Sequence, residues 1–198
     1  GGAATTKISI RAPQMSPVDE VTHLDYAYRI SKGELPRRYQ PTDPYVRERR
    51  LCMGLQTEPG DTPDRCGESL PPDDSRGTGN YNAKHPPLYY AATGLTARVV
   101  SSVAGIEFST AARLVGGLWL GAAMAALLHA LRVWRVPLSG ALPSALLLPL
   151  IPGVLNSTAA VNNDAVAPLA GALTLIVCAR VFRDRDYRLA FPAATTLF

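Results

Sequence analysis

The chain has 198 residues, of which 47% are hydrophobic and only 18% are charged. Soluble domains carry about 25% charged residues, and three cysteines are too few for a small secreted scaffold built on disulfides. The net charge of +4 lies entirely in residues 109–198, because residues 1–108 hold 13 basic and 13 acidic residues. A neutral polar half argues against nucleic acid as a partner.

The first local signal is a helix start near residue 17. Ser16 is a good N-cap, Pro17 suits the first helical position, and Asp19 completes an S-x-x-D capping box. The sequence predicts a helix from Pro17 to about Lys32, with Gly33 as its left-handed stop. One face of it is suited to packing on membrane spans or lying along the membrane, and this face comprises Val21, Leu24, Tyr28 and Ser31.

Two acids and a histidine lie on the first turns of this helix. Asp19 and Glu20 stand four and three residues before His23, so the three side chains are predicted to converge on one site. The alternative is that the two acids only complement the helix dipole. One turn further on, Asp25 and Arg29 are expected to form a solvent-exposed ion pair.

Residues 36–84 are rich in Pro, Asp, Arg and Gly and show little periodicity, which predicts a long loop. Cys52 and Cys66 lie inside it and are predicted to form a disulfide, the alternative being two free thiols. Neither C-x-x-C nor H-E-x-x-H nor a glycine-rich nucleotide motif occurs in the sequence. No cofactor is indicated, and a divalent metal stays open.

Three apolar runs follow, each close to the roughly 20 residues that a membrane-spanning helix needs. They cover about residues 109–131, 138–155 and 162–179, and a fourth begins near residue 189. Buried helices of a large soluble protein are the alternative, but successive runs of this kind leave no polar outer face. The sequence therefore predicts an all-α polytopic membrane protein embedded in a lipid membrane.

Arginines set the predicted orientation. Clusters follow the first and third runs, namely Arg132 and Arg135, then Arg180, Arg183, Arg185 and Arg188. The positive-inside rule places both clusters in the cytoplasm. Residues 1–108 then form a large extracytoplasmic loop with juxtamembrane helices, and residues 109–198 form the transmembrane part. Since residues 1–10 lack the apolar core of a signal peptide, a transmembrane helix is expected to precede this chain.

Two further polar clusters are predicted at the outer membrane surface. Lys84 and His85 open the stretch K-H-P-P-L-Y-Y, where with Tyr89 they are placed to meet an anionic head group. Asn163 and Asp164 stand at the outer mouth of the third run, where an acid facing the helix bundle is a functional candidate. Interfacial anchoring and helix capping are the respective alternatives.

The order of these motifs is D-E-x-x-H on an outer helix, H-P-P-L-Y-Y before the next span and N-N-D before a later one. It resembles the N-terminal part of GT-C-type integral membrane glycosyltransferases, allied to the protein O-mannosyltransferases and aminoarabinose transferases, over about Pro17 to Gly171. The resemblance implies a GT-C-like fold in the bacterial plasma membrane. It also implies inverting transfer of a sugar from a polyprenyl-phosphate donor to an extracytoplasmic glycan or protein acceptor, with Asp19 or Glu20 as the essential acid.

The residue chemistry suits this interpretation. A carboxylate in a low-dielectric site takes the proton of the acceptor hydroxyl, and His23 would orient it. Lys84, His85 or a loop arginine would offset the charge of the leaving lipid phosphate. Asn163 and Asp164 would line the same cavity.

Two other classes of function stay open on the sequence. One is a transporter or flippase, in which Asp164 would be an intramembrane ion or proton site. The other is a non-catalytic assembly subunit whose outer loop docks partner proteins.

Overall fold

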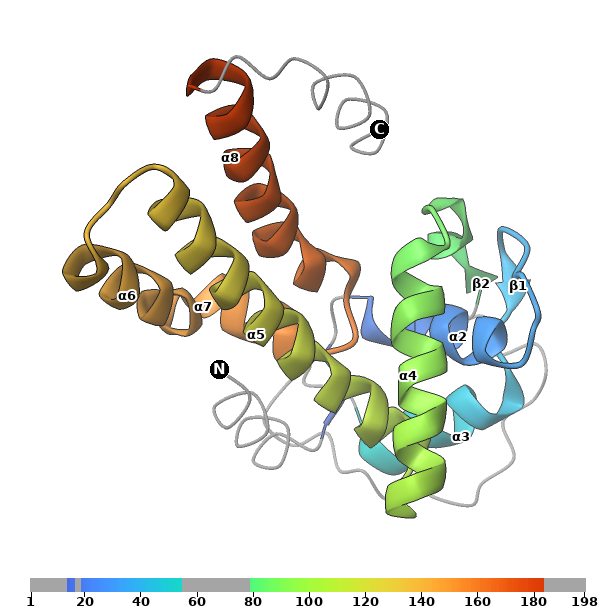
Figure 1. The fold of residues 1–198 in the computed structure, drawn as a ribbon. Helices are drawn as coiled ribbons and strands as arrows, with labels where there is room; N and C mark the ends of the chain where they lie inside the picture. The colour runs from blue at the N-terminus through green and yellow to red at the C-terminus, as the bar shows by residue number, and fades with distance from the viewer. Residues whose placement is uncertain (1–13, 17–18, 55–78, 184–198) are drawn as a thin grey trace.

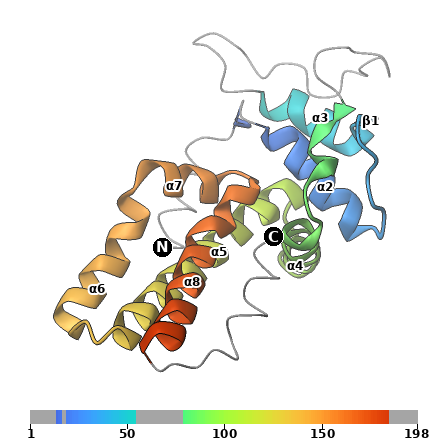
Figure 2. The same ribbon diagram turned by 90° about the horizontal axis from the view of Figure 1, so that it is seen from above.

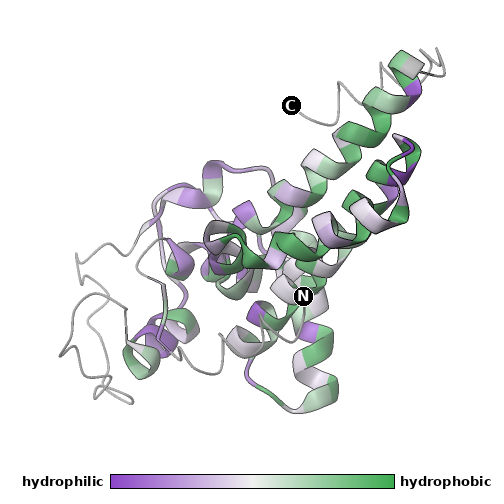
Figure 3. Ribbon diagram, turned by 90° about the vertical axis from the view of Figure 1, so that its left-hand side faces the viewer, coloured by the Kyte–Doolittle hydropathy of each residue, from purple (hydrophilic) through white to green (hydrophobic). Residues whose placement is uncertain are grey.

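The computed structural model describes residues 14–16, 19–54 and 79–183. A polar lobe contains α2 (Glu20–Ser31), α3 (Pro44–Met53), α4 (Leu88–Ala104), the strands β1 (Gln40–Pro41) and β2 (Gly79–Asn80), and the 3-10 turn η1 (Tyr81–Lys84). Beside it stand α5 (Phe108–Val133), α6 (Leu138–Leu147), η2 (Leu148–Leu150), α7 (Pro152–Ala159), η3 (Asn163–Val166) and α8 (Ala167–Arg183) (Figure 1). Green, apolar residues gather on the second group and purple, polar ones on the lobe (Figure 3).

Helix α2 begins later than the sequence predicts. Asp19 has a left-handed backbone with φ of 61°, so the first helical residue is Glu20 and not Pro17. The predicted capping box is therefore wrong, and the backbone N–H of Ser16 instead donates to Oε2 of Glu20 at 2.6 Å. The end of the helix is as predicted, because Gly33 has the left-handed φ of 83° that glycine adopts without strain.

The predicted apolar face of α2 is confirmed as a packing face. Leu24 is buried in a core with Val46 of α3 and Phe108 of α5, and Val21 and Tyr28 pack against the same core. Helix α4 crosses the other side of α2 closely, since a Cβ added at Gly94 would lie 2.2 Å from the carbonyl oxygen of Ala27. Helix α2 therefore sits between α4 and the start of the first long apolar helix.

The ion pair between Asp25 and Arg29 is buried, and the prediction that it is solvent-exposed is wrong. Nε of Arg29 lies 3.2 Å from both carboxylate oxygens of Asp25. The same carboxylate accepts hydrogen bonds from the backbone N–H of Asp43 and from Nδ2 of Asn80, both at 2.7 Å. Distant loop residues thus fold over the helix and cover the pair, which local sequence spacing does not reveal.

Part of the predicted long loop is regular structure. Helix α3 begins at Pro44, which suits the first helical position. The side chain of Asp43 caps it by accepting a hydrogen bond from the backbone N–H of Tyr45 at 3.0 Å. Strands β1 and β2 pair antiparallel, with Gln40 opposite Asn80. The dipeptide Asp-Pro at residues 43–44 is the helix-start signal that the composition of the loop obscured.

Two described helices, Phe108–Val133 and Asn163–Phe182, are long and apolar enough to cross a membrane. The second predicted span is not one straight helix, because its two parts, Leu138–Leu150 and Pro152–Ala159, are bent by 62°. Prolines at 149 and 152 remove backbone N–H donors on both sides of the break. The prediction is thus confirmed at its coarser level, as a mainly helical chain with two or three helices fit to span a membrane.

Helices α5 and α8 lie side by side, and their C-terminal ends point to the same end of the molecule (Figures 1 and 2). Nε1 of Trp134, just after α5, donates to the backbone oxygen of Leu175 in α8 at 3.0 Å. Arg132 and Arg180 therefore stand at one common end. The prediction requires this, because the first and third apolar runs cross in the same direction with one run between them. The fourth predicted span, from residue 189, lies outside the described residues.

Candidate functional site

The candidate site lies where the start of α2, η1, the start of α4 and η3 come together. His23 is buried at its centre. Its Nδ1 lies 2.8 Å from the hydroxyl of Tyr90, and its Nε2 lies 3.3 Å from Nδ2 of Asn82. The ring of His85 follows, with its centroid 6.3 Å from that of His23.

Burial lowers the pKa of His23 to about 4, so the ring is neutral at pH 7. The negative charges of Asp19 and Asp164 act to raise this pKa, and His85 acts to lower it, which places all three side chains within electrostatic reach of His23. Because the amide N–H of Asn82 can only donate, Nε2 is the acceptor and Nδ1 carries the proton toward Tyr90. The ring is a neutral, fixed support and not the partner of an acid.

Asp19 is half-buried and immediately precedes α2. Its left-handed backbone costs on the order of 1–3 kcal/mol for a residue other than glycine, and such strain is concentrated at functional sites. The hydroxyl of Tyr81 donates to its Oδ1. Among the described residues no other hydrogen-bond donor meets this carboxylate, so Oδ2 is left open.

Glu20 is turned away from this cluster and is saturated. Its carboxylate receives Nε of Arg113 at 2.7 Å and Nη2 of Arg113 at 2.9 Å. It also accepts hydrogen bonds from the backbone N–H groups of Ser16 and Val161. The two acids that sequence spacing placed together therefore lie in different surroundings, and only Asp19 joins His23.

The K-H-P-P-L-Y-Y segment begins with mostly exposed residues and ends with two buried tyrosines. The side chain of Lys84 is exposed at the end of η1, and the backbone oxygen of His85 accepts a hydrogen bond from the hydroxyl of Tyr26 at 3.0 Å. Tyr89 is buried in the wall of the site, where it packs with Tyr26, Tyr90 and Ala165. Burial raises the pKa of this phenol, which is a structural group here.

The N-N-D segment forms η3, directly before α8. Oδ1 of Asn162 accepts a hydrogen bond from the backbone N–H of Asp164 at 2.9 Å, so Asn162 is the capping residue. This leaves the carboxylate of Asp164 exposed, with its charge felt at His23. Asn163 is half-buried beside it.

Three residues of the site were not anticipated from the sequence: Tyr81, Asn82 and Tyr90. The ring of Tyr90 stacks between Tyr26, at 3.9 Å between centroids, and His23, at 5.8 Å. Tyr81 and Asn82 stand four and three residues before His85, directly upstream of the proline pair. An aromatic residue followed by a polar one, just upstream of the two prolines, was the sequence signal that could have identified Tyr81 and Asn82.

Cys52, in α3, is disulfide-bonded, and Cys178, in α8, is a free thiol. Cys66 lies outside the described residues. Within the residues that the structure describes, no group of three or more His, Cys, Asp or Glu side chains is placed to hold a metal ion.

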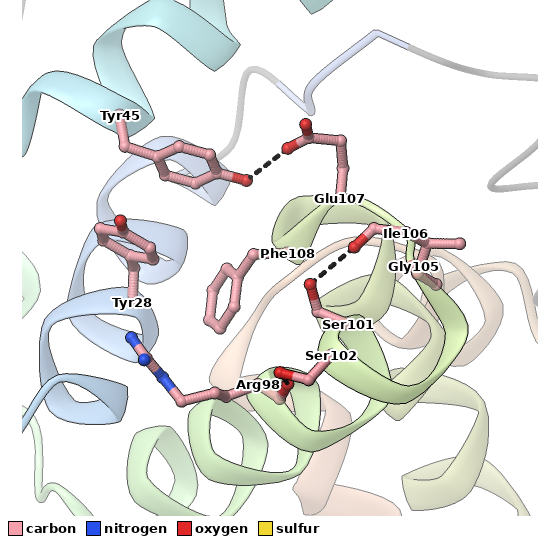
Figure 4. Close-up of a pocket in the computed structure, with 9 residues that line it drawn as sticks. All are labelled: Tyr28, Tyr45, Arg98, Ser101, Ser102, Gly105, Ile106, Glu107 and Phe108. Carbon is pink, nitrogen blue, oxygen red and sulfur yellow. Dashed lines mark hydrogen bonds between the residues drawn. The ribbon is translucent and has the colours of Figure 1, made fainter.

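A hollow of about 410 Å³ lies away from these residues, at the turn between α4 and α5 (Figure 4). Tyr45, Arg98 and Glu107 are among its lining residues, and the hydroxyl of Tyr45 donates to Oε2 of Glu107 at 3.1 Å. None of the site residues predicted from the sequence lines it.

No family model matches the chain, and comparison with curated proteins and with solved structures finds no match.

Proposed function

We propose that this chain is a GT-C-type membrane glycosyltransferase that moves a sugar from a polyprenyl-phosphate donor to an extracytoplasmic glycan or protein acceptor, with Asp19 as general base. The observation that carries the proposal is the division between the two neighbouring acids. Glu20 is saturated by four donors, whereas Asp19, within electrostatic reach of His23, has one carboxylate oxygen that meets no hydrogen-bond donor among the described residues. We choose glycosyl transfer as the reaction because the order of the sequence motifs resembles that of GT-C-type enzymes.

The chemistry assigned to these residues is a single displacement. The open oxygen of Asp19 takes the proton of the acceptor hydroxyl as the hydroxyl oxygen forms a bond to the anomeric carbon. The bond from that carbon to the phosphate oxygen of the donor breaks, and its electron pair leaves with the lipid phosphate. Lys84, exposed at the rim, and His85 are assigned to that phosphate, and the displacement inverts the anomeric centre.

The position of the cluster suits a lipid donor. Asn163 and Asp164 begin the Asn163–Phe182 candidate span, so the site lies at one end of the apolar helices. Large apolar side chains are exposed along these helices, among them Leu118 and Leu173, and a polyprenyl tail would lie against them. In this proposal the arginine-rich helix ends are cytoplasmic, and the lobe is on the extracytoplasmic side of a bacterial plasma membrane.

The test is sugar transfer by the full chain in liposomes, with radiolabelled polyprenyl-phosphate hexose and pentose donors. Asp19→Asn is expected to lower the rate by about 10²–10⁴-fold, because it keeps the shape and removes the base. Glu34→Gln is the matched control, since Glu34 is an exposed acid at the far end of α2 and should leave the rate unchanged. A wild-type chain inactive with every donor, or an Asp19→Asn variant of near-normal rate and thermal stability, would contradict the proposal.

The bend between α6 and α7 favours a second candidate, a transporter or flippase, because broken helices are typical of transporter binding sites. In that case Asp164 would bind the coupling ion. The break lies near Ile151, however, and none of the site residues belongs to it. Ion-driven uptake or lipid flipping in liposomes that Asp164→Asn abolishes, with sugar transfer absent, would favour this candidate.

A further inference from the structure

We infer that Tyr81 is a positioning residue for Asp19: its hydroxyl holds one carboxylate oxygen of Asp19 and leaves the other oxygen directed toward the acceptor. This inference rests on the proposed function and extends it to a residue outside the motifs. Tyr81 is the hydrogen-bond donor to Oδ1 of Asp19, 62 residues away in the chain.

The two residues belong to a closed ring of contacts. The hydroxyl of Thr22 donates to the backbone oxygen of Asp19 at 2.9 Å and accepts a hydrogen bond from Nδ2 of Asn82 at 2.7 Å. Asn82 is the chain neighbour of Tyr81, and Tyr81 returns to the side chain of Asp19. The ring fixes both the backbone and the carboxylate of Asp19, and it accounts for how the left-handed backbone is held.

Tyr81 is itself held in place from both sides. Asn80 and Asn82 are both buried, with 0% and 2% exposure. Nδ2 of Asn80 donates to Oδ2 of Asp25 in α2 at 2.7 Å, and Asn82 is bound to Thr22 of the same helix. The phenol between them therefore has a fixed position relative to the start of α2.

A phenol donor suits a general base. A hydrogen bond to one oxygen of a carboxylate fixes the rotation of the group, so the second oxygen of Asp19 keeps one direction. Burial and the neighbouring Asp19 raise the pKa of the Tyr81 phenol, which therefore keeps its proton and remains the donor. One oxygen is occupied by Tyr81, and the other is left for the acceptor hydroxyl.

The test is Tyr81→Phe in the full chain, read in two ways. The first is the division of the effect between kcat and KM for sugar transfer: kcat should fall by about tenfold with KM nearly unchanged, because the base is present but no longer held in direction. The second is a double-mutant cycle of Tyr81→Phe with Asp19→Ala in thermal unfolding, in which the loss of stability for the pair should be smaller than the sum of the two single losses, because both remove the same hydrogen bond. Tyr39→Phe is the matched control, because the Tyr39 ring is 63% exposed; it should leave kcat unchanged and combine additively with Asp19→Ala.

Additive losses of stability for Tyr81→Phe and Asp19→Ala overturn the inference, whatever the rates are. In an active chain, an unchanged kcat or an effect confined to KM overturns it as well. Coupled losses of stability in a chain without transfer activity support the action of Tyr81 on Asp19 and contradict the proposed glycosyl transfer. The two failures are thus told apart.

Discussion

Glu20 and Arg113 lie 93 residues apart in the chain and form a buried, two-pronged ion pair, with Nε–Oε1 at 2.7 Å and Nη2–Oε2 at 2.9 Å. The pair joins the start of α2 to the first long apolar helix. Nη2 of Arg113 also donates to the backbone oxygen of Gln14, and Oε1 of Glu20 accepts from the backbone of Val161. This ion pair therefore connects α2 and α5 with the segment at Gln14 and the turn between α7 and η3.

We expect Glu20→Gln to lower the free energy of unfolding by about 3–5 kcal/mol, because it leaves the Arg113 guanidinium buried without its counter-charge. The control is Glu34→Gln, whose carboxylate is 53% exposed against Arg29 and should change stability by less than about 1 kcal/mol. Thermal unfolding in detergent measures both. Equal, small shifts for the two variants would show that the buried pair is not a structural link.

Helix α5 also packs closely against the backbone of α7, at Gly116. A Cβ added there would lie 2.0 Å from the backbone oxygen of Thr158 in α7, whereas a Cβ at Gly121 meets nothing within 4 Å. Gly116→Ala is expected to destabilise the protein by about 1–3 kcal/mol, because α7 must move away from α5. Gly121→Ala, on the same helix, should be neutral or slightly stabilising in the same unfolding experiment. The opposite ranking would contradict this packing of α7 on α5.

Because His23 is buried in its neutral form, we expect the free energy of unfolding to fall in acid. Its pKa is lowered from 6.5 to about 4 by burial, so between these values the unfolded chain binds a proton that the folded chain does not. The stabilisation is fully present above pH 6.5 and is lost as the pH falls toward 4, by about 3 kcal/mol at most. His23→Gln should be less stable at pH 7 and should lose this part of the pH dependence.

Leu35→Ala provides the control for this experiment, because the Leu35 side chain is 68% exposed on the lobe and carries no ionisable group. It should retain the wild-type pH dependence between pH 7 and 4.5 in thermal unfolding. If His23→Gln and the wild-type chain lose stability in parallel over that range, His23 is not buried in its neutral form.

The orientation of the lobe can be measured with cysteine labelling in a Cys178→Ser background. Cysteines at Arg37, exposed on the lobe, and at Arg180, exposed at the end of α8, should react with a membrane-impermeant maleimide from opposite sides of sealed membranes. Cys52 is disulfide-bonded and should not react. Reaction of both introduced cysteines from one side would contradict the topology.

The sequence by itself determined the elements whose signals are local. The first and third charge-free apolar runs form long helices, and Gly33 ended α2 because glycine enters the left-handed region without strain. Asp19, His23, His85 and Asp164 were chosen from motif order and residue type, and the other three lie within electrostatic reach of His23. Local periodicity and backbone preference are sufficient for such features.

Only the tertiary structure decided what each polar group does. Glu20 stands next to Asp19, yet its role follows from Arg113, a residue of another helix, and Asp25 is buried because Asp43 and Asn80 fold over it. Tyr81 reaches Asp19 across 62 residues. A carboxylate serves as a structural ion or as an open base according to the donors around it and its access to water, and in this chain those donors come from segments that sequence spacing cannot bring together.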